Sequence, residues 1–181
     1  MKVFLFHCWG GDGKSCWSGW LSDELKKQGI EVIAPDFPDT NNPKLEAWLA
    51  KTRENVPRFS EGWVLIGHSL GCPTILRLLE SFEDDERVKA VILVAAFADD
   101  LKIPQIQNFV DKKFDWNKIK WKSDKFIVIN SDNDPFIPLK EGERIANLLN
   151  AELIIEHGAG HINEGAGFTK YERLLKIIEK L

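Results

Sequence analysis

Residues 63–71 read WVLIGHSLG, and the architecture of the chain is predicted from them outward. A short apolar run leads directly into Gly-x-Ser-x-Gly, and apolar residues at helical spacing follow. In this strand–turn–helix context the turn is sharp and exposes its serine at the end of the strand. Glycine suits the positions two before and two after Ser69, because a Cβ there would meet the adjacent strand and helix. We therefore predict that Ser69 is a nucleophile at a helix N-terminus, where free N–H groups favour a developing anion.

Six short apolar runs, including the one before Ser69, are rich in Val, Ile and Phe, as strands covered on both faces are. They are residues 3–6, 31–34, 63–66, 90–95, 126–130 and 153–155. Stripes at helical spacing lie at 17–25, 45–56, 75–82 and 174–181. The alternation predicts an α/β fold of about six mainly parallel strands with helices on both faces. A ligand site is expected at the carboxyl ends of the strands.

The chain has 181 residues, which fits a single domain spanning 1–181. A net charge of −4 gives no electrostatic footprint for nucleic acid. The three cysteines, Cys8, Cys16 and Cys72, show no close spacing, which argues against a disulfide framework and a zinc site. No apolar run approaches the ~18–20 residues of a membrane span. We expect a cytoplasmic protein with no cofactor, no metal and no membrane association.

A nucleophilic serine needs a general base, and only His157 and His161 follow the later strands. His161 lies in a glycine-rich loop, GAGH, after the last apolar run. His157 abuts the end of that run and has less freedom to reach Ser69. We predict that His161 is the base.

The base needs a carboxylate that orients it, and four aspartates follow the fourth and fifth runs. Asp134 is preferred because the prolines after it stiffen the turn that would hold its carboxylate. Asp132 is interpreted as a turn residue whose side chain satisfies backbone N–H groups. Asp99 and Asp100 remain the main rivals, since a triad acid can also come from that strand end.

The oxyanion of an acyl-transfer reaction needs two backbone N–H donors. One is expected from Leu70, the residue after the nucleophile, and the other from the loop after the first run. Trp9 is preferred there because two glycines follow it and let the backbone turn sharply. His7 is predicted to end the strand and hydrogen-bond the loop. Cys8 and Cys72 are interpreted as neutral filler thiols.

The segment 97–124 is longer than a normal connection between strands. It is predicted to be partly helical, and it is read equally as a small lid over the site or as a simple surface crossover. Four aromatic residues could line an apolar acyl pocket, although most aromatic residues in proteins belong to the hydrophobic core. They are Trp9, Phe37, Trp116 and Trp121.

These pieces together resemble the family of small α/β-hydrolases typified by retinoblastoma-binding protein nine and its short bacterial relatives. The matching stretches are residues 7–11 with the tryptophans behind them, 34–38, 48–49, 67–72, 131–138 and 160–163. The resemblance implies a compact α/β-hydrolase fold that begins at the third strand of larger hydrolases and has little or no cap. It also implies a triad of Ser69, Asp134 and His161. Many hydrolases of this type carry glycine where this chain has Cys8. A side chain at that position could tilt the oxyanion loop, so the resemblance supports Trp9 as an oxyanion donor less directly.

The predicted function is hydrolysis of an ester or related acyl bond through this triad and an acyl-enzyme intermediate. The expected partner is a small acyl substrate. A peptidase or amidase with the same triad is one alternative. The other alternative is a non-catalytic protein-binding module that has kept the fold, because function is argued from the site and not from the fold.

Overall fold

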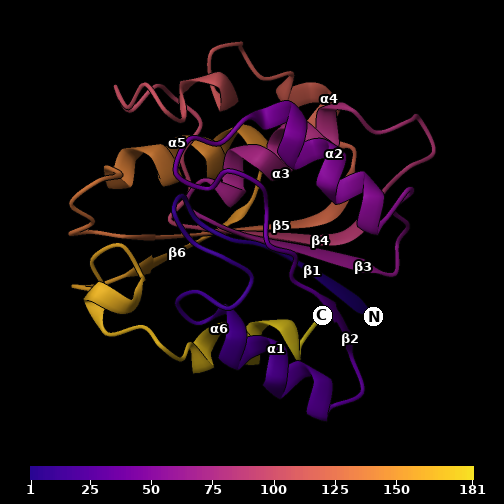
Figure 1. Ribbon diagram of the computed structural model, residues 1–181, viewed down its shortest axis with the longest axis horizontal. Coiled ribbons are helices and arrows are strands. Elements are labelled where there is room, and N and C mark those ends of the chain that lie inside the picture. The colour runs from indigo at the N-terminus through magenta and orange to yellow at the C-terminus, as the bar shows by residue number, and fades with distance from the viewer.

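The computed structural model describes residues 1–181, and its centre is one six-stranded parallel sheet (Figure 1). The strand order is β2-β1-β3-β4-β5-β6, and every neighbouring pair is parallel. The strands are β1 (Lys2–Phe6), β2 (Glu31–Ile33), β3 (Trp63–His68), β4 (Val88–Val94), β5 (Ser123–Ser131) and β6 (Glu152–Glu156). The six predicted runs are thus confirmed as strands, with β5 starting three residues earlier than expected.

Helices cover both faces of the sheet, as predicted (Figure 1). One face carries α1 (Ser18–Lys27) and α6 (Glu172–Ile178). The other carries α2 (Leu45–Asn55), α3 (Gly71–Glu80), α4 (Trp116–Lys120) and α5 (Leu139–Leu149). Two short 3₁₀ turns, η1 (Gln107–Phe109) and η2 (Glu164–Ala166), lie in the connections.

The alternation of side chains along each strand divides the core into two parts. In β1, Phe4 and Phe6 face the core beneath α2 to α5, whereas Val3 and Leu5 face the core beneath α1 and α6. All six residues of β3 are buried. Burial on both faces explains why this strand is almost continuously apolar in sequence.

The strand order places the functional loops together. β1 is flanked by β2 on one side and β3 on the other, so the direction of winding reverses around it. In α/β sheets, ligands bind outside the carboxyl ends of the strands at such a point. The register aligns these ends, with Phe6 opposite Gly67 and His68 opposite Val94.

The helix α5 was not among the predicted stripes. Its buried face combines the apolar Ile145, Ala146 and Leu149 with Glu141 and Gly142, so residues that are not apolar interrupt the stripe. Gly142 is required by packing, because a Cβ there would lie 2.5 Å from the side chain of Asn130 at the end of β5. The close approach of α5 to β5 therefore depends on a glycine within the buried face of the helix.

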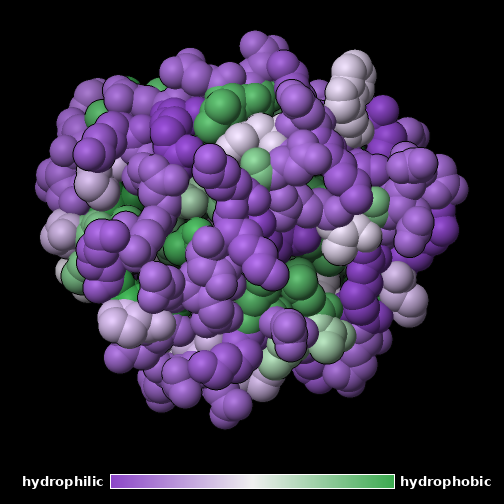
Figure 2. Space-filling view, turned by 90° about the horizontal axis from the view of Figure 1, so that it is seen from above, coloured by the Kyte–Doolittle hydropathy of each residue, from purple (hydrophilic) through white to green (hydrophobic).

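Seen from above, the surface is mostly hydrophilic, and apolar residues gather in separate patches between polar ones (Figure 2). None of the helices is both long enough and apolar enough to cross a lipid bilayer.

Candidate active site

Ser69 lies on the strained turn that its flanking glycines predict. Its φ angle is +53°, in the left-handed region, and its N–H donates to the carbonyl oxygen of Val94 at 2.9 Å. A Cβ on Gly67 would lie 2.8 Å from the backbone of Gly71, and one on Gly71 would lie 2.2 Å from the carbonyl oxygen of Phe6. Only glycine fits either position, and the turn thereby holds Ser69 at the N-terminus of α3.

His161 and Asp134 are hydrogen-bonded to each other. The distance between His161 Nδ1 and Asp134 Oδ2 is 2.8 Å; the aspartate side chain is 0% exposed and the histidine 11%. Asp134 Oδ1 accepts the backbone N–H groups of Phe136 and Ile137, at 2.9 and 3.1 Å. One carboxylate oxygen is therefore fixed by the backbone and the other by the imidazole. With Nδ1–H donated to Asp134, the lone pair of His161 lies on Nε2.

Asp132 belongs to a separate pair with the other candidate base. Its Oδ2 lies 2.6 Å from Nδ1 of His157, a side chain that is 82% exposed. Its Oδ1 accepts the N–H of Gly158 at 2.8 Å. The pKa of Asp132 is lowered mainly by its hydrogen bond from Gly158 and, to a smaller extent, by its hydrogen bond with His157. Asp132 does satisfy a backbone N–H, but the donor belongs to the loop after β6 and not to its own turn.

The other rival aspartates also have partners away from His161. Asp99 pairs with Arg144 at 2.9 Å, and Asp100 pairs with Lys102 at 2.9 Å. Among the four candidates, the structure therefore brings only Asp134 to His161.

Two residues that the sequence reasoning did not single out hold the loop that carries His161. The amide oxygen of Asn133 accepts the N–H of Gly160 at 2.7 Å, and Ser131 Oγ accepts the N–H of Ala159 at 3.1 Å. Ser131 also donates to the Asn133 oxygen at 2.8 Å. The polar run after β5 was the available signal, because such side chains commonly satisfy loop backbone groups.

His68, inside the Gly-x-Ser-x-Gly motif, contacts the same loop from the other side. Its Nε2 lies 3.0 Å from the carbonyl oxygen of His161. The imidazole is 2% exposed, and its ring packs against those of Trp17 and His161. His68, at the unspecified position before the serine of the motif, thus supports the backbone of the candidate base.

The two candidate oxyanion donors have unpaired N–H groups. Neither Leu70 N–H nor Trp9 N–H makes a hydrogen bond within the chain. His7 organises this loop as predicted, since its Nε2 accepts the N–H of Phe37 at 3.0 Å and its Nδ1 lies 2.8 Å from the carbonyl oxygen of Cys8. Burial lowers the pKa of His7, so the neutral ring is favoured.

A cavity of about 250 Å³ opens beside the nucleophile. Its lining comes from the loops after β1, β3, β5 and β6 and from the segment after β4. The twelve lining residues are Cys8, Trp9, Ser69, Leu70, Phe97, Leu101, Ile103, Ile106, Phe136, Ile137, His161 and Asn163. Ser69 and His161 therefore face one largely apolar chamber, with the free N–H of Leu70 next to the serine.

Of the four aromatic residues considered for an acyl pocket, one lines the cavity, and the alternative of a core position holds for Phe37 and Trp116. Trp9 lines the cavity, but Phe37 is buried and stacks on Trp48. Trp116 packs on the core beside Phe114, and Trp121 is 72% exposed. Phe97 and Phe136, which follow strand ends, are the other aromatics at the cavity.

The segment 97–124 is partly helical, as predicted, with η1 and α4 in it. Leu101, Ile103 and Ile106 form one wall of the cavity. Its start is fixed by the buried Glu141, whose Oε2 accepts the N–H of Ala98 at 3.2 Å. The segment is therefore a wall of the site as well as the crossover from β4 to β5.

The thiols nearest the site are neutral, as expected. Burial raises the pKa of Cys72, and a hydrogen bond to Cys16, together with burial, raises the pKa of Cys8. The same bond, with His68 beside it, lowers the pKa of Cys16 to about 4. Cys8 thus has a partner that the sequence did not reveal.

Comparison with known proteins shows the family to which the chain belongs. The family described as serine hydrolase matches residues 3–180. The chain belongs to the serine hydrolase family. This member is 32% identical over 170 residues to the putative hydrolase YdeN of Bacillus subtilis, an alignment that covers 93% of the chain and 89% of YdeN. It is 28% identical over 176 residues to the serine hydrolase RBBP9 of Rattus norvegicus, covering 95% and 90%.

Solved structures place this serine hydrolase among α/β-hydrolases. The crystal structure of the ydeN gene product superposes with a TM-score of 0.94 at 28% identity, covering 99% of the chain and 97% of that structure. A mutant of polyneuridine aldehyde esterase superposes with a TM-score of 0.69 at 13% identity, covering 99% and 98%. The second likeness concerns the fold alone. The predicted compact α/β-hydrolase fold is confirmed, and so is the family resemblance.

Proposed function

We propose that this serine hydrolase cleaves carboxylic esters through Ser69, His161 and Asp134 by way of an acyl-enzyme. The observation that carries the proposal is the 2.8 Å bond between His161 Nδ1 and the buried Asp134, in a cavity that Ser69 and His161 both line. A buried carboxylate that fixes the tautomer and orientation of an imidazole beside a strained serine is the arrangement for nucleophilic acyl transfer.

In the first step, Ser69 Oγ attacks the carbonyl carbon of the ester while Nε2 of His161 takes the hydroxyl proton. Asp134 stabilises the imidazolium that forms, and His161 then returns the proton to the leaving alcohol as the carbon–oxygen bond breaks. In the second step, His161 takes a proton from water as the water attacks the acyl-enzyme. Ser69 regains its proton, and the carboxylic acid leaves.

Charge that develops on the carbonyl oxygen is stabilised by the N–H groups of Leu70 and Trp9. Both are free of other hydrogen bonds, so they need not break an existing interaction to donate. Leu70 lies at the start of α3, where the helix dipole adds to the effect. Each such donor contributes about 3 kcal/mol of transition-state stabilisation.

The chamber favours a compact apolar acyl group. Nine of its twelve lining residues are hydrophobic, and its volume is about 250 Å³. That is just below the ~300–1,000 Å³ of sites that enclose drug-sized ligands. Short acyl chains should therefore fit inside, with the alcohol portion extending toward solvent.

The proposal is tested by turnover of p-nitrophenyl esters of increasing acyl length. We expect Ser69→Ala to lose at least ~10⁴-fold in kcat. The matched control is Ser60→Ala, an exposed serine before β3, at the opposite end of that strand from Ser69, which should keep wild-type turnover. Wild-type levels of turnover in Ser69→Ala would refute the mechanism, and preference for aminoacyl amides over esters would refute the substrate class.

A further inference from the structure

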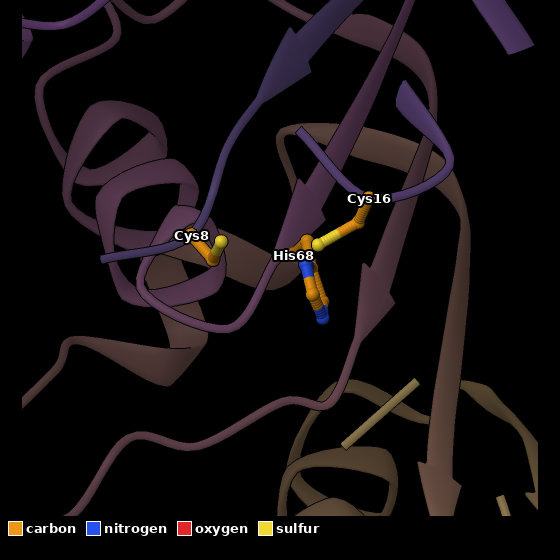
Figure 3. Close-up of side chains that lie close together, drawn as sticks. All are labelled: Cys8, Cys16 and His68. Carbon is orange, nitrogen blue, oxygen red and sulfur yellow. The ribbon is translucent and has the colours of Figure 1, made fainter. Parts of the chain in front are cut away.

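Three side chains with soft and borderline ligand atoms meet beside the nucleophile turn. The ligand atoms of Cys8, Cys16 and His68 all lie within 4.8 Å of one another. Cys8 follows β1, Cys16 is in the turn before α1, and His68 ends β3. Figure 3 shows the three side chains close together, with the Cys16 sulfur beside a nitrogen of the His68 ring. We call these three residues the thiol–imidazole cluster.

The imidazole in this cluster is oriented as metal-bound imidazoles are. Nε2 of His68 is engaged by the carbonyl oxygen of His161 at 3.0 Å, which fixes the proton there and leaves the lone pair on Nδ1. Histidine ligands of metals commonly donate their second ring N–H to a backbone carbonyl in this way. The ring is 2% exposed, so its position is well determined by packing.

The backbone that presents Cys16 is strained. Its φ angle is +57°, a conformation that a side-chain-bearing residue seldom adopts outside functional or tightly constrained sites. Its N–H donates to Glu164 Oε1 at 3.0 Å, and the indole of the adjacent Trp17 donates to the carbonyl oxygen of Ile162 at 3.1 Å. The turn before α1 is thereby tied to the loop that follows His161, with the Cys16 sulfur directed into the cluster.

We propose that Cys8 Sγ, Cys16 Sγ and His68 Nδ1 bind a thiophilic cation of the zinc class. In tetrahedral zinc sites with Zn–S of about 2.3 Å and Zn–N of about 2.0–2.1 Å, ligand atoms are about 3.5–3.8 Å apart. A limit of 4.8 Å therefore requires any two of the ligand atoms to approach each other by at most about 1.3 Å. Two sulfurs and one imidazole also match the softness of Zn²⁺ and exclude Mg²⁺ and Ca²⁺ as preferred ions.

The sequence did not indicate this site because its ligands come from three elements without a close-spaced Cys or His pair. Three protein ligands leave a fourth position for water or another small ligand. The cation would also join three loops that converge on Ser69, but its binding is independent of the proposed ester hydrolysis.

The test is titration of the full chain with Co²⁺ and then Zn²⁺ in the presence of a phosphine reductant. We expect one equivalent of Co²⁺ to produce thiolate-to-metal charge-transfer absorption, which one equivalent of Zn²⁺ abolishes. Cys72→Ala, the matched control, removes the third thiol and should bind like wild type. Cys16→Ser should bind Zn²⁺ more than ~100-fold more weakly, since losing even an outer-shell partner costs ~10–100-fold.

Cys8→Ser is the second ligand variant, and circular dichroism checks that both variants are folded. The absence of charge-transfer absorption in the wild type overturns the proposal. So does wild-type Zn²⁺ affinity in either folded ligand variant, because the ion would then be bound elsewhere, for example at the exposed Asp132–His157 pair.

Discussion

At the scale of single residues, Asp134 and Asp132 are chemically identical and lie two positions apart, yet each contacts a different histidine. The side chain of Asp134 is fully buried and holds His161, whereas Asp132 holds the exposed His157. The difference comes from the turn, in which the N–H groups of Phe136 and Ile137 fix Asp134 Oδ1. Burial and orientation, and not residue type, thus distinguish the candidate acid.

Asp134→Asn should reduce kcat by about 10⁴-fold. The amide oxygen can still accept the N–H groups of its turn, but its NH₂ would donate to His161 Nδ1 and impose the wrong tautomer. Asp132→Asn is the matched control and should stay within a few-fold of wild type. Steady-state ester turnover measures both, and an equal loss in the two variants would contradict the assignment.

At the scale of elements, the nucleophile turn between β3 and α3 was the most predictable part of the molecule. Its glycines are required by contacts within one local unit, and that requirement is readable from the spacing. The loop after β6 was less predictable. His161 could be chosen from its position, but the support from Ser131, Asn133 and His68 depends on contacts across three strand ends.

Gly71→Ala should destabilise the protein by about 3 kcal/mol or more. Its Cβ would lie 2.2 Å from the carbonyl oxygen of Phe6, so the backbone of β1 would have to shift to make room for it. Gly62→Ala is the matched control. The nearest atom to a Cβ there is Ser60 Oγ at 3.8 Å, an ordinary contact, so stability should change little. Urea denaturation measures both, and a small effect of Gly71→Ala would show that the turn is not held as described.

At the scale of the whole molecule, apolar pattern predicted the parallel sheet and the helices on both faces. It did not predict α5, whose buried face includes a glutamate and a glycine. Nor did it identify Leu101, Ile103 and Ile106 as a cavity wall. An apolar residue in a long connection can pack on the core or line a cavity, and the sequence does not distinguish the two. The thiol–imidazole cluster likewise arises only when three segments meet.

Whole-molecule stability should fall as the pH is lowered below about 6.5, the ordinary pKa of histidine. Burial lowers the pKa of His7 in the folded state, so the unfolded chain takes up a proton first, and stability is lost as pH falls through the folded pKa. His7→Gln does not titrate and should lose less stability between pH 6.5 and about 5. Urea unfolding at several pH values measures this, and identical slopes in the two proteins would contradict it.

The central claim is that Ser69 is a nucleophile activated by His161, and covalent labelling with a fluorophosphonate followed by peptide mapping tests it most directly. We expect a single adduct on Ser69 in the wild type, with labelling far slower in a folded His161→Ala variant and unchanged in His157→Ala. An adduct on another residue, no adduct on the folded wild type, or equal labelling rates in the two histidine variants would contradict the account.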